Sequence, residues 1–308
     1  MSRVPSPSPS PVAGGASRSA ASLPLLVLRA ARPRQWLKNL LVGAAPLAAG
    51  TLFESRTAER VALALVAFCL LSSAGYLVND VQDLELDRSH PTKQLRPVAA
   101  GLLGVGVAVS VAVVLGLSGL AVAAAVDLRL AALGLLYLAM TAAYSLGIKR
   151  QPVFDLALVA AGFLLRPIAG GIAAGVPLSQ WFLLVTSFGS LFMVAGKRYA
   201  DVLAQEGSGE RPPAVGYSLS YLRFVWGVAA GATIMGYALW ALQVGAARGQ
   251  SVWAEVSVAP FVLAILRYAV DVDRGDAGAP EDVVLRDRGL LLIGLVWLLT
   301  FALAADVG

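Results

Sequence analysis

The stretch Asn79-Asp80-Val81-Gln82-Asp83-Leu84-Glu85-Leu86-Asp87 closes an apolar run that covers about residues 58–79. An apolar run of about 20 residues is long enough for a helix to cross a lipid bilayer. Carboxylates are costly at membrane depth unless they have a partner. This stretch therefore predicts a membrane helix that emerges from the bilayer in a group of acids, and it indicates an all-α membrane protein.

The composition of the whole chain agrees with this prediction. Of its 308 residues, 58% are hydrophobic and only 14% are charged, whereas soluble domains carry about 25% charged residues. Residues 1–22 are rich in Ser, Pro, Gly and Ala and predict a disordered tail. Residues 23–308 are expected to form one transmembrane domain. The net charge of +5 comes from basic residues in short loops, which indicates a topology signal rather than nucleic-acid binding.

Apolar runs elsewhere in the chain complete a prediction of nine membrane helices. The run from Pro97 to Val126 is long for one span and short for two, so we interpret it as one helix plus an apolar turn. The nine predicted spans are residues 38–53, 58–79, 98–118, 130–148, 153–174, 179–197, 219–245, 252–270 and 288–305.

The basic residues give these spans an orientation. With the N-terminus inside, nineteen of the 24 Lys and Arg residues fall in segments on the cytoplasmic side. Only Arg56, Arg60, Arg129 and Arg248 fall outside, and Arg166 lies within a span. This bias predicts a cytoplasmic N-terminus, an external C-terminus and a site that faces the cytoplasm.

The group of acids is the leading candidate for chemistry. On a continuous α-helix, with about 100° per residue, the side chains of Asn79, Asp80, Asp83 and Asp87 share one face. Oxygen donors of this kind suit Mg²⁺, which shares its coordination with substrate phosphates. The alternative is a solvated helix end with scattered acids, but acids at a helix C-terminus oppose the macrodipole. The cluster therefore predicts a site for Mg²⁺ bound to a diphosphate.

Basic and polar side chains near predicted helix ends are candidates for substrate binding, and the cations among them are candidates for phosphate contacts. Each has a plainer interpretation, as an interfacial anchor or a topology signal, and the single histidine, His90, receives no role. These candidates are Arg34, Lys38, Lys93, Arg96, Tyr144, Lys149, Arg150, Lys197, Arg198, Tyr199 and Asp201. Lys197 and Asp201 are also spaced to pair with each other on a helix. The acids between residues 271 and 287 are interpreted as a hydrated loop.

Two ionisable residues fall inside the fifth predicted span. Asp155 and Arg166 are eleven residues apart, which places them on one helix face about 16 Å apart. Ionisable groups inside a span normally face the protein interior or a wet cavity. The separation is too long for a direct pair, so we expect a ligand or a third group between or beside them.

The acidic stretch resembles the first aspartate-rich motif of the UbiA-type intramembrane prenyltransferases. The segment from Tyr144 to Arg150, with Asp155 after it, is similar to a further motif of that family. The resemblance implies nine helices around a central cavity, in the plasma membrane. A narrower resemblance, to the branch that transfers phosphoribose to decaprenyl phosphate, rests on the stretches 32–39, 90–97 and 196–199. The family's second Asp-x-x-x-Asp motif is replaced here by a basic segment ending in Asp201.

This branch implies a Mg²⁺-dependent transfer of 5-phosphoribose from 5-phosphoribosyl 1-diphosphate to a polyprenyl (decaprenyl) phosphate, in the supply of cell-wall arabinan. Asp80, Asp83 and Asp87 would be the catalytic metal ligands, assisted by Asn79. Two alternatives remain open: prenyl transfer to an aromatic or other acceptor, and a transporter or non-catalytic lipid-phosphate binder. The apolar helix faces are equally compatible with surrounding membrane lipid and with a homo-oligomer.

Overall fold

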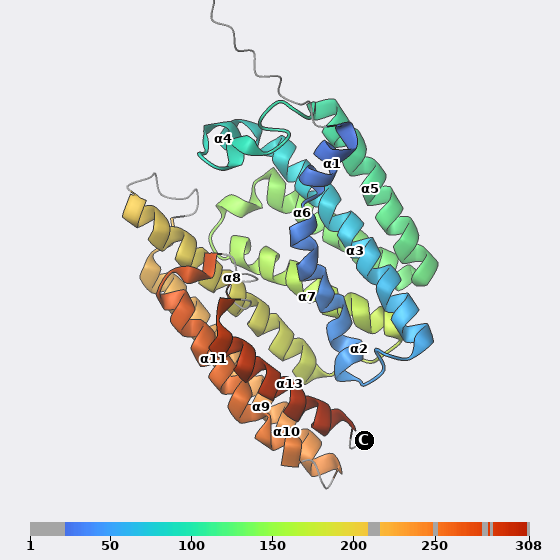
Figure 1. Cartoon of the computed structure of the whole chain (residues 1–308), viewed down its shortest axis with the longest axis vertical. Helices are drawn as coiled ribbons and strands as arrows, with labels where there is room; N and C mark the ends of the chain where they lie inside the picture. Colours follow the sequence, from blue (N-terminus) through green and yellow to red (C-terminus); the bar gives the residue numbers. More distant parts are fainter. Residues whose placement is uncertain (1–21, 209–215, 249–251, 279–282, 284–285, 307–308) are drawn as a thin grey trace, which may run out of the picture.

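The computed structural model describes residues 22–208, 216–248, 252–278, 283 and 286–306, and every element in them is helical (Figure 1). The predicted tail lies outside the described residues, apart from Ser22. Helices written η are of the 3-10 type. The elements are α1 (Leu23–Ala31), η1 (Pro33–Gly43), α2 (Ala44–Ala48), α3 (Ser55–Gln82), α4 (Leu84–Ser89), η2 (Lys93–Leu95), α5 (Val105–Val126), α6 (Leu128–Leu146), η3 (Ile148–Arg150), α7 (Phe154–Ala174), α8 (Gln180–Ser208), α9 (Leu219–Arg248), α10 (Val252–Val256), α11 (Val258–Asp273), η4 (Asp276–Gly278) and α13 (Arg288–Asp306).

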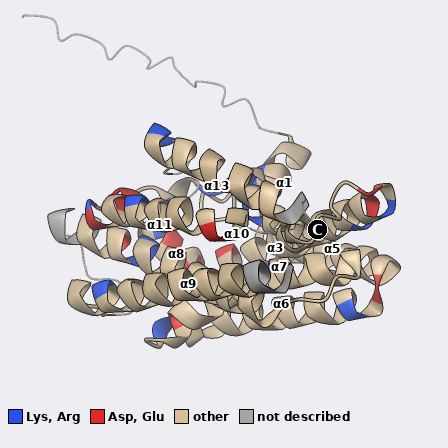
Figure 2. Ribbon diagram, turned by 90° about the horizontal axis from the view of Figure 1, so that it is seen from below, with Lys and Arg blue, Asp and Glu red and all other residues tan. Residues whose placement is uncertain are grey.

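Six of the described helical stretches are long and apolar enough to cross a membrane. They are α3, α5, α6, α7, residues 219–243 of α9, and residues 252–273, which contain α10 and α11. Most of the charged residues lie toward the ends of the helices (Figure 2). The class of all-α membrane protein is thus confirmed, and the count of nine spans stays a prediction.

The helix boundaries correct three predicted spans. The sixth, predicted as residues 179–197, extends as α8 to Ser208. Helical structure in the first segment begins at Leu23, not at residue 38, and it ends at Ala48. The third helix covers Val105–Val126 instead of residues 98–118, because the apolar turn after Pro97 precedes the helix rather than following it. Both parts of the run are apolar, so hydropathy alone does not place that turn. Pro97, Gly101 and Gly104 are the residues that could have indicated it.

The first segment is interrupted at Arg32. Pro33 disfavours a helical conformation in the residue before it, and Arg32 takes the left-handed conformation with φ 56° and ψ 64°. The hydroxyl of Ser73 on α3 donates to the carbonyl of Ala31 at 3.0 Å, which satisfies a backbone group that the break exposes. The chain then continues as η1, an unusually long 3-10 helix.

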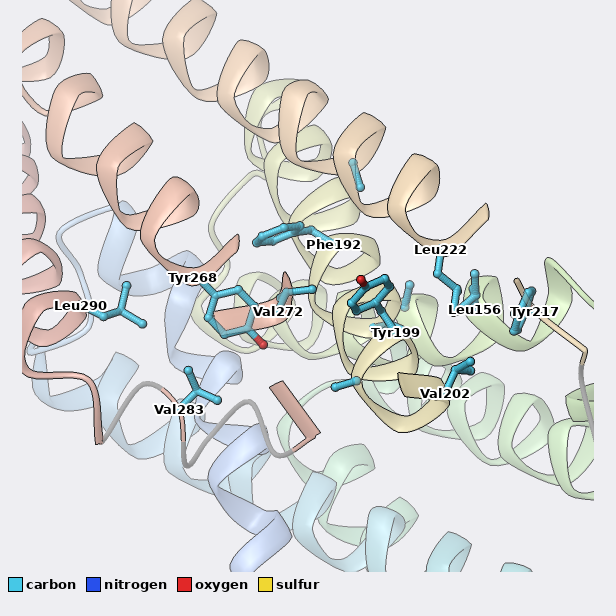
Figure 3. Close-up of a cluster of buried hydrophobic side chains, with 14 residues drawn as sticks. Leu156, Phe192, Tyr199, Val202, Tyr217, Leu222, Tyr268, Val272, Val283 and Leu290 are labelled. Carbon is cyan, nitrogen blue, oxygen red and sulfur yellow. The ribbon is translucent and has the colours of Figure 1, made fainter. Parts of the chain in front are cut away.

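Two apolar cores meet at α7. One joins η1, α3, α5, α6 and α7, and Phe68 and Leu71 are fully buried in it. The other joins α7 to α8, α9 and α11, around Phe192, Tyr268 and Val272 (Figure 3). Asp155 lies near the start of α7, and Arg166 lies farther along the same helix. Both residues are therefore placed between the two cores.

Candidate functional site

The predicted acidic cluster lies at a break between two helices. α3 ends at Gln82, and Asp83, with φ −94° and ψ 12°, separates it from α4. The arrangement calculated for one continuous helix therefore does not apply beyond Asp83. Asp80 and Asp87 are nevertheless both buried, at 1% and 2% exposure. Both carboxylates therefore face the protein interior.

Two arginines hold Asp80 and Asp87. Arg32, at the break before η1, donates from Nη2 to Asp80 Oδ1. Arg96 donates from Nη1 to the same oxygen at 3.2 Å and to Asp87 Oδ2 at 2.6 Å. The guanidinium of Arg32 also lies 5.0 Å from the ring centroid of Tyr76. The sequence makes Arg96 a candidate. It offers Arg32 as a cytoplasmic basic residue and as the first residue of the resembling stretch 32–39, but not as a site residue.

The other half of the cluster joins α3 to the end of α6. Asn79 Nδ2 donates to Asp83 Oδ2 at 3.0 Å, and the Lys149 ammonium in η3 pairs with Asp83 Oδ1. Ser145 Oγ donates to Asn79 Oδ1 at 3.3 Å. The structure therefore brings Lys149 to the acids. It also adds Ser145, which the sequence offers as a hydrogen-bonding group at the same helix end as Tyr144 but not as a site residue.

The oxygen donors suit a hard divalent cation. Asp80 Oδ2 is buried and accepts no hydrogen bond from the described residues, so it retains the capacity to bind a cation. Across the described part of the chain, no three acidic, histidine or cysteine side chains surround a common point; each carboxylate is paired with a basic side chain instead. Binding of an ion by all three would require Arg96 and Lys149 to turn toward the ligand.

A second polar group links α6, α7 and α8. Asp155, at 1% exposure, accepts from Arg198 Nη2 through both oxygens, at 2.8 and 2.9 Å. The Tyr144 hydroxyl donates to Asp155 Oδ1 at 3.0 Å. These three predicted residues are in contact, and Arg198 is committed to a buried carboxylate.

Arg166 lies on α7, is 5% exposed, and faces η1 and α6. Its Nε donates to Asn39 Oδ1 at 2.7 Å, and its Nη1 donates to the carbonyl of Gly162 at 2.5 Å. The guanidinium is 5.4 Å from the ring centroids of Tyr137 and Phe163. Asp155 and Arg166 thus each have separate partners, as expected for groups too far apart to pair.

The remaining candidates are more scattered. Arg34, Lys93 and Arg150 are exposed. Lys197 Nζ pairs with Asp201 at 2.9 Å, the plainer of the two interpretations of that segment. Tyr199 is buried in the core, and its hydroxyl accepts from Arg223 at 2.8 Å.

Two acids of the predicted hydrated loop lie in a helix instead. Asp271 and Asp273 both belong to α11, and Asp271 is only 7% exposed. The helix continues beyond the predicted span because Val272 packs into the core against Gly196 of α8. Glu281 and Asp282 of the same predicted loop lie outside the described residues.

Comparisons with known proteins identify the family of this chain. Residues 39–293 match the UbiA prenyltransferase family. Decaprenyl-phosphate phosphoribosyltransferase of Corynebacterium glutamicum is 50% identical over 288 residues, which cover 91% of this chain and 87% of that protein. The enzyme of the same name from Mycobacterium tuberculosis is also 50% identical, over 92% of this chain and 95% of its own length.

A solved structure supports the fold. A UbiA homolog from Archaeoglobus fulgidus, bound to GPP and Mg²⁺, superimposes with a TM-score of 0.69 at 18% identity, covering 92% of this chain and 99% of that one. Both levels of the resemblance seen in the sequence, the family and the branch, are therefore confirmed. This chain, a multi-pass membrane protein, belongs to the UbiA prenyltransferase family.

Proposed function

We propose that this protein transfers 5-phosphoribose from 5-phosphoribosyl 1-diphosphate to decaprenyl phosphate and releases diphosphate. The observation that carries the proposal is 50% identity, over nearly the whole chain, to two proteins with the corresponding name. The paired acids and cations at the end of α3 support it, because a site with three basic side chains suits substrates that both carry phosphate. The product would supply cell-wall arabinan synthesis.

Asp80, Asp83 and Asp87, with Asn79, would hold Mg²⁺ on the diphosphate of the sugar donor. When bound, the ion neutralises the charge that develops on the leaving diphosphate. Arg32, Arg96 and Lys149, which pair with these carboxylates, lie where they can turn to the phosphate oxygens. An acceptor phosphate is already ionised, so its attack on the ribose carbon needs no strong base, and the half-buried His90 remains without a role.

The fold proposed for this activity has nine spans. Beyond the six long apolar stretches, the broken segment α1–η1–α2, the helix α8 and the helix α13 supply the other three. In this arrangement the N-terminus and the aspartate cluster face the cytoplasm, where a sugar diphosphate is available, and the protein resides in the plasma membrane.

The proposal is tested with purified protein in lipid nanodiscs, labelled phosphoribosyl diphosphate, decaprenyl phosphate and Mg²⁺. We expect labelled lipid to form, and chelation of the metal to stop its formation. Asp83→Ala should abolish transfer. The matched control is Glu85→Gln on α4, whose side chain is 82% exposed and which should retain activity. Turnover of a prenyl diphosphate without labelled lipid would instead support prenyl transfer.

A further inference from the structure

The 3-10 form of η1 sorts its side chains into three rows. A 3-10 helix has about three residues per turn, so residues three apart lie above one another. The first row, Trp36, Asn39 and Val42, faces the protein: Asn39 and Val42 are fully buried, and Trp36 Nε1 donates to Ser73 at 3.0 Å. The second row contains Leu37 and Leu40, which are 52% and 60% exposed and face the surroundings of the first segment.

The third row, called the polar row, contains two polar residues, Gln35 and Lys38, and ends with Leu41, which is 39% exposed. Gln35 and Lys38 are half-buried, and Lys38 Nζ donates to Gln35 Oε1 at 2.5 Å. The same ammonium lies 6.0 Å from the ring centroid of Phe163 on α7. The row starts at Arg32, whose carbonyl accepts from the Gln35 amide at 2.9 Å and whose guanidinium reaches Asp80.

This row runs away from the aspartate cluster and along the membrane segment. At about 2.0 Å of rise per residue, Lys38 lies about 12 Å beyond Arg32. On an α-helix the three residues would instead spiral by about 120° around the axis. The unusual helix type therefore extends a line of polar side chains, Arg32, Gln35 and Lys38, from the acids to a position beside the exposed Leu37 and Leu40.

Contacts on the buried row hold this arrangement in place. Arg166 donates to Asn39 Oδ1 at 2.7 Å, and Asn39 Nδ2 donates to Ser72 at 3.2 Å. A Cβ atom on Gly170 of α7 would lie 1.7 Å from the carbonyl oxygen of Val42, so the two backbones are in close contact. Arg166 thus acts on the polar row through Asn39, as a positioning residue.

We propose that Lys38, with Gln35, binds the phosphate of the polyprenyl acceptor, while Arg32, Arg96 and Lys149 serve the sugar diphosphate. A lipid phosphate enters from the bilayer, so the cation that binds it should lie next to apolar surface. Lys38 is such a cation, because the exposed Leu37 and Leu40 lie beside it. Its ammonium supplies a point charge and the Gln35 amide supplies further donors. A water-soluble sugar diphosphate reaches the cluster at the helix ends instead. This assignment rests on the proposed transfer reaction.

Steady-state kinetics of the full-length protein test the assignment. Loss of one charge-assisted phosphate contact corresponds to at least about a tenfold weaker interaction, so Lys38→Met should raise the KM for polyprenyl phosphate by about that factor. The KM for phosphoribosyl diphosphate should change less than about twofold. Lys38→Arg should restore most of the affinity, and Lys149→Met should show the opposite pattern. Lys38→Gln repeats the test if Lys38→Met does not fold.

Two control substitutions in the same segment leave the polar row unchanged. Arg29→Met removes an exposed cation of α1, and Leu37→Met alters the exposed row; both should leave the two KM values unchanged. Equal changes in both KM values for Lys38→Met, or no change in that for the lipid, would overturn the assignment.

A binding measurement separates this assignment from the proposed reaction. Without sugar diphosphate, the wild-type protein should bind polyprenyl phosphate more tightly than the polyprenol of the same length, and Lys38→Met should lose that preference. A preference that depends on Lys38, in a protein that transfers no phosphoribose, would support the lipid-phosphate site and refute the reaction. Normal transfer with a preference that survives Lys38→Met would refute the site alone.

Discussion

At the scale of single residues, the carboxylates of this site are stable in the interior because each has a cation. Asp155 is the clearest case, since it is 1% exposed and both of its oxygens accept from Arg198. Removal of one partner from a buried ion pair leaves an uncompensated charge, which costs about 3–5 kcal/mol. The hydrogen bond from Tyr144 compensates for only part of such a loss.

Arg198→Met is therefore expected to destabilise the protein by about 3 kcal/mol, and Asp155→Asn added to it should restore part of that loss. Lys197→Met is the matched control, because its pair with Asp201 joins side chains that are 45% and 31% exposed and should contribute less than about 1 kcal/mol. Unfolding free energies in detergent, combined in a double-mutant cycle, measure the coupling. Equal losses for Arg198→Met and Lys197→Met would contradict the buried pair.

Backbone strain beside η3 gives a second prediction at this scale. Val153 has φ 69° and ψ −53°, and the Phe154 amide donates across it to the carbonyl of Pro152 at 2.8 Å. A β-branched residue is strained in this conformation. The Tyr217 hydroxyl accepts from the Val153 amide at 3.0 Å and stabilises the turn that follows Lys149.

Glycine adopts positive φ without this strain. Val153→Gly should accordingly raise the free energy of unfolding by about 1 kcal/mol, the balance of strain relieved and backbone entropy lost. Val153→Ala, which keeps a Cβ atom, is the comparison, and thermal unfolding in detergent is the measurement. A lower unfolding midpoint for Val153→Gly than for Val153→Ala would show that the turn is not strained.

At the scale of elements, the close contact between η1 and α7 is the most sensitive feature. Gly170→Ala would place a Cβ atom 1.7 Å from the carbonyl oxygen of Val42, so the helices must separate. Overpacking of this kind costs about 1–3 kcal/mol, and the shift should also lower transfer activity. Gly162→Ala on the same helix is the control, because its nearest neighbour, Tyr137, would be 3.9 Å away. Equal unfolding midpoints for both variants would refute the contact.

The start of α6 provides a prediction about pH. Asp127 caps this helix by accepting from the Arg129 amide at 2.8 Å. The Arg129 guanidinium and, to a smaller extent, the Arg129 backbone amide donate to this carboxylate. These hydrogen bonds lower the pKa of Asp127 from 3.8 to about 2. Because the folded pKa is depressed, the stabilisation is present above pH 3.8 and is lost as the pH falls toward 2. The difference in unfolding midpoint between wild type and Asp127→Ala should be constant near neutral pH and should shrink below pH 4. A constant difference down to pH 2 would contradict the ionised cap.

At the scale of the whole molecule, the sequence could predict the class and the family because both depend on local features. Apolar runs predict membrane helices directly, and Asp80, Asp83 and Asp87 form a motif within one short stretch of sequence. The pairing of Arg32 with Asp80 joins residues 48 positions apart and depends on tertiary structure. The 3-10 form of η1 was also out of reach, since it depends on contacts such as that of Gly170 with Val42.

Orientation in the membrane is the property on which the proposed chemistry depends most, because a sugar diphosphate is available only inside the cell. Phe53 and Lys93 precede and follow α3, and both are exposed. If α3 crosses the bilayer, these positions lie on opposite sides, and the distribution of basic residues places Lys93 inside. Cys69 is the only cysteine, so Cys69→Ala gives a background without thiols. In that background, a membrane-impermeant thiol reagent added to intact cells should label Phe53→Cys and not Lys93→Cys, and permeabilised cells should show labelling of both. Labelling of Lys93→Cys alone in intact cells would place the aspartate cluster outside and would refute the proposed reaction together with the topology.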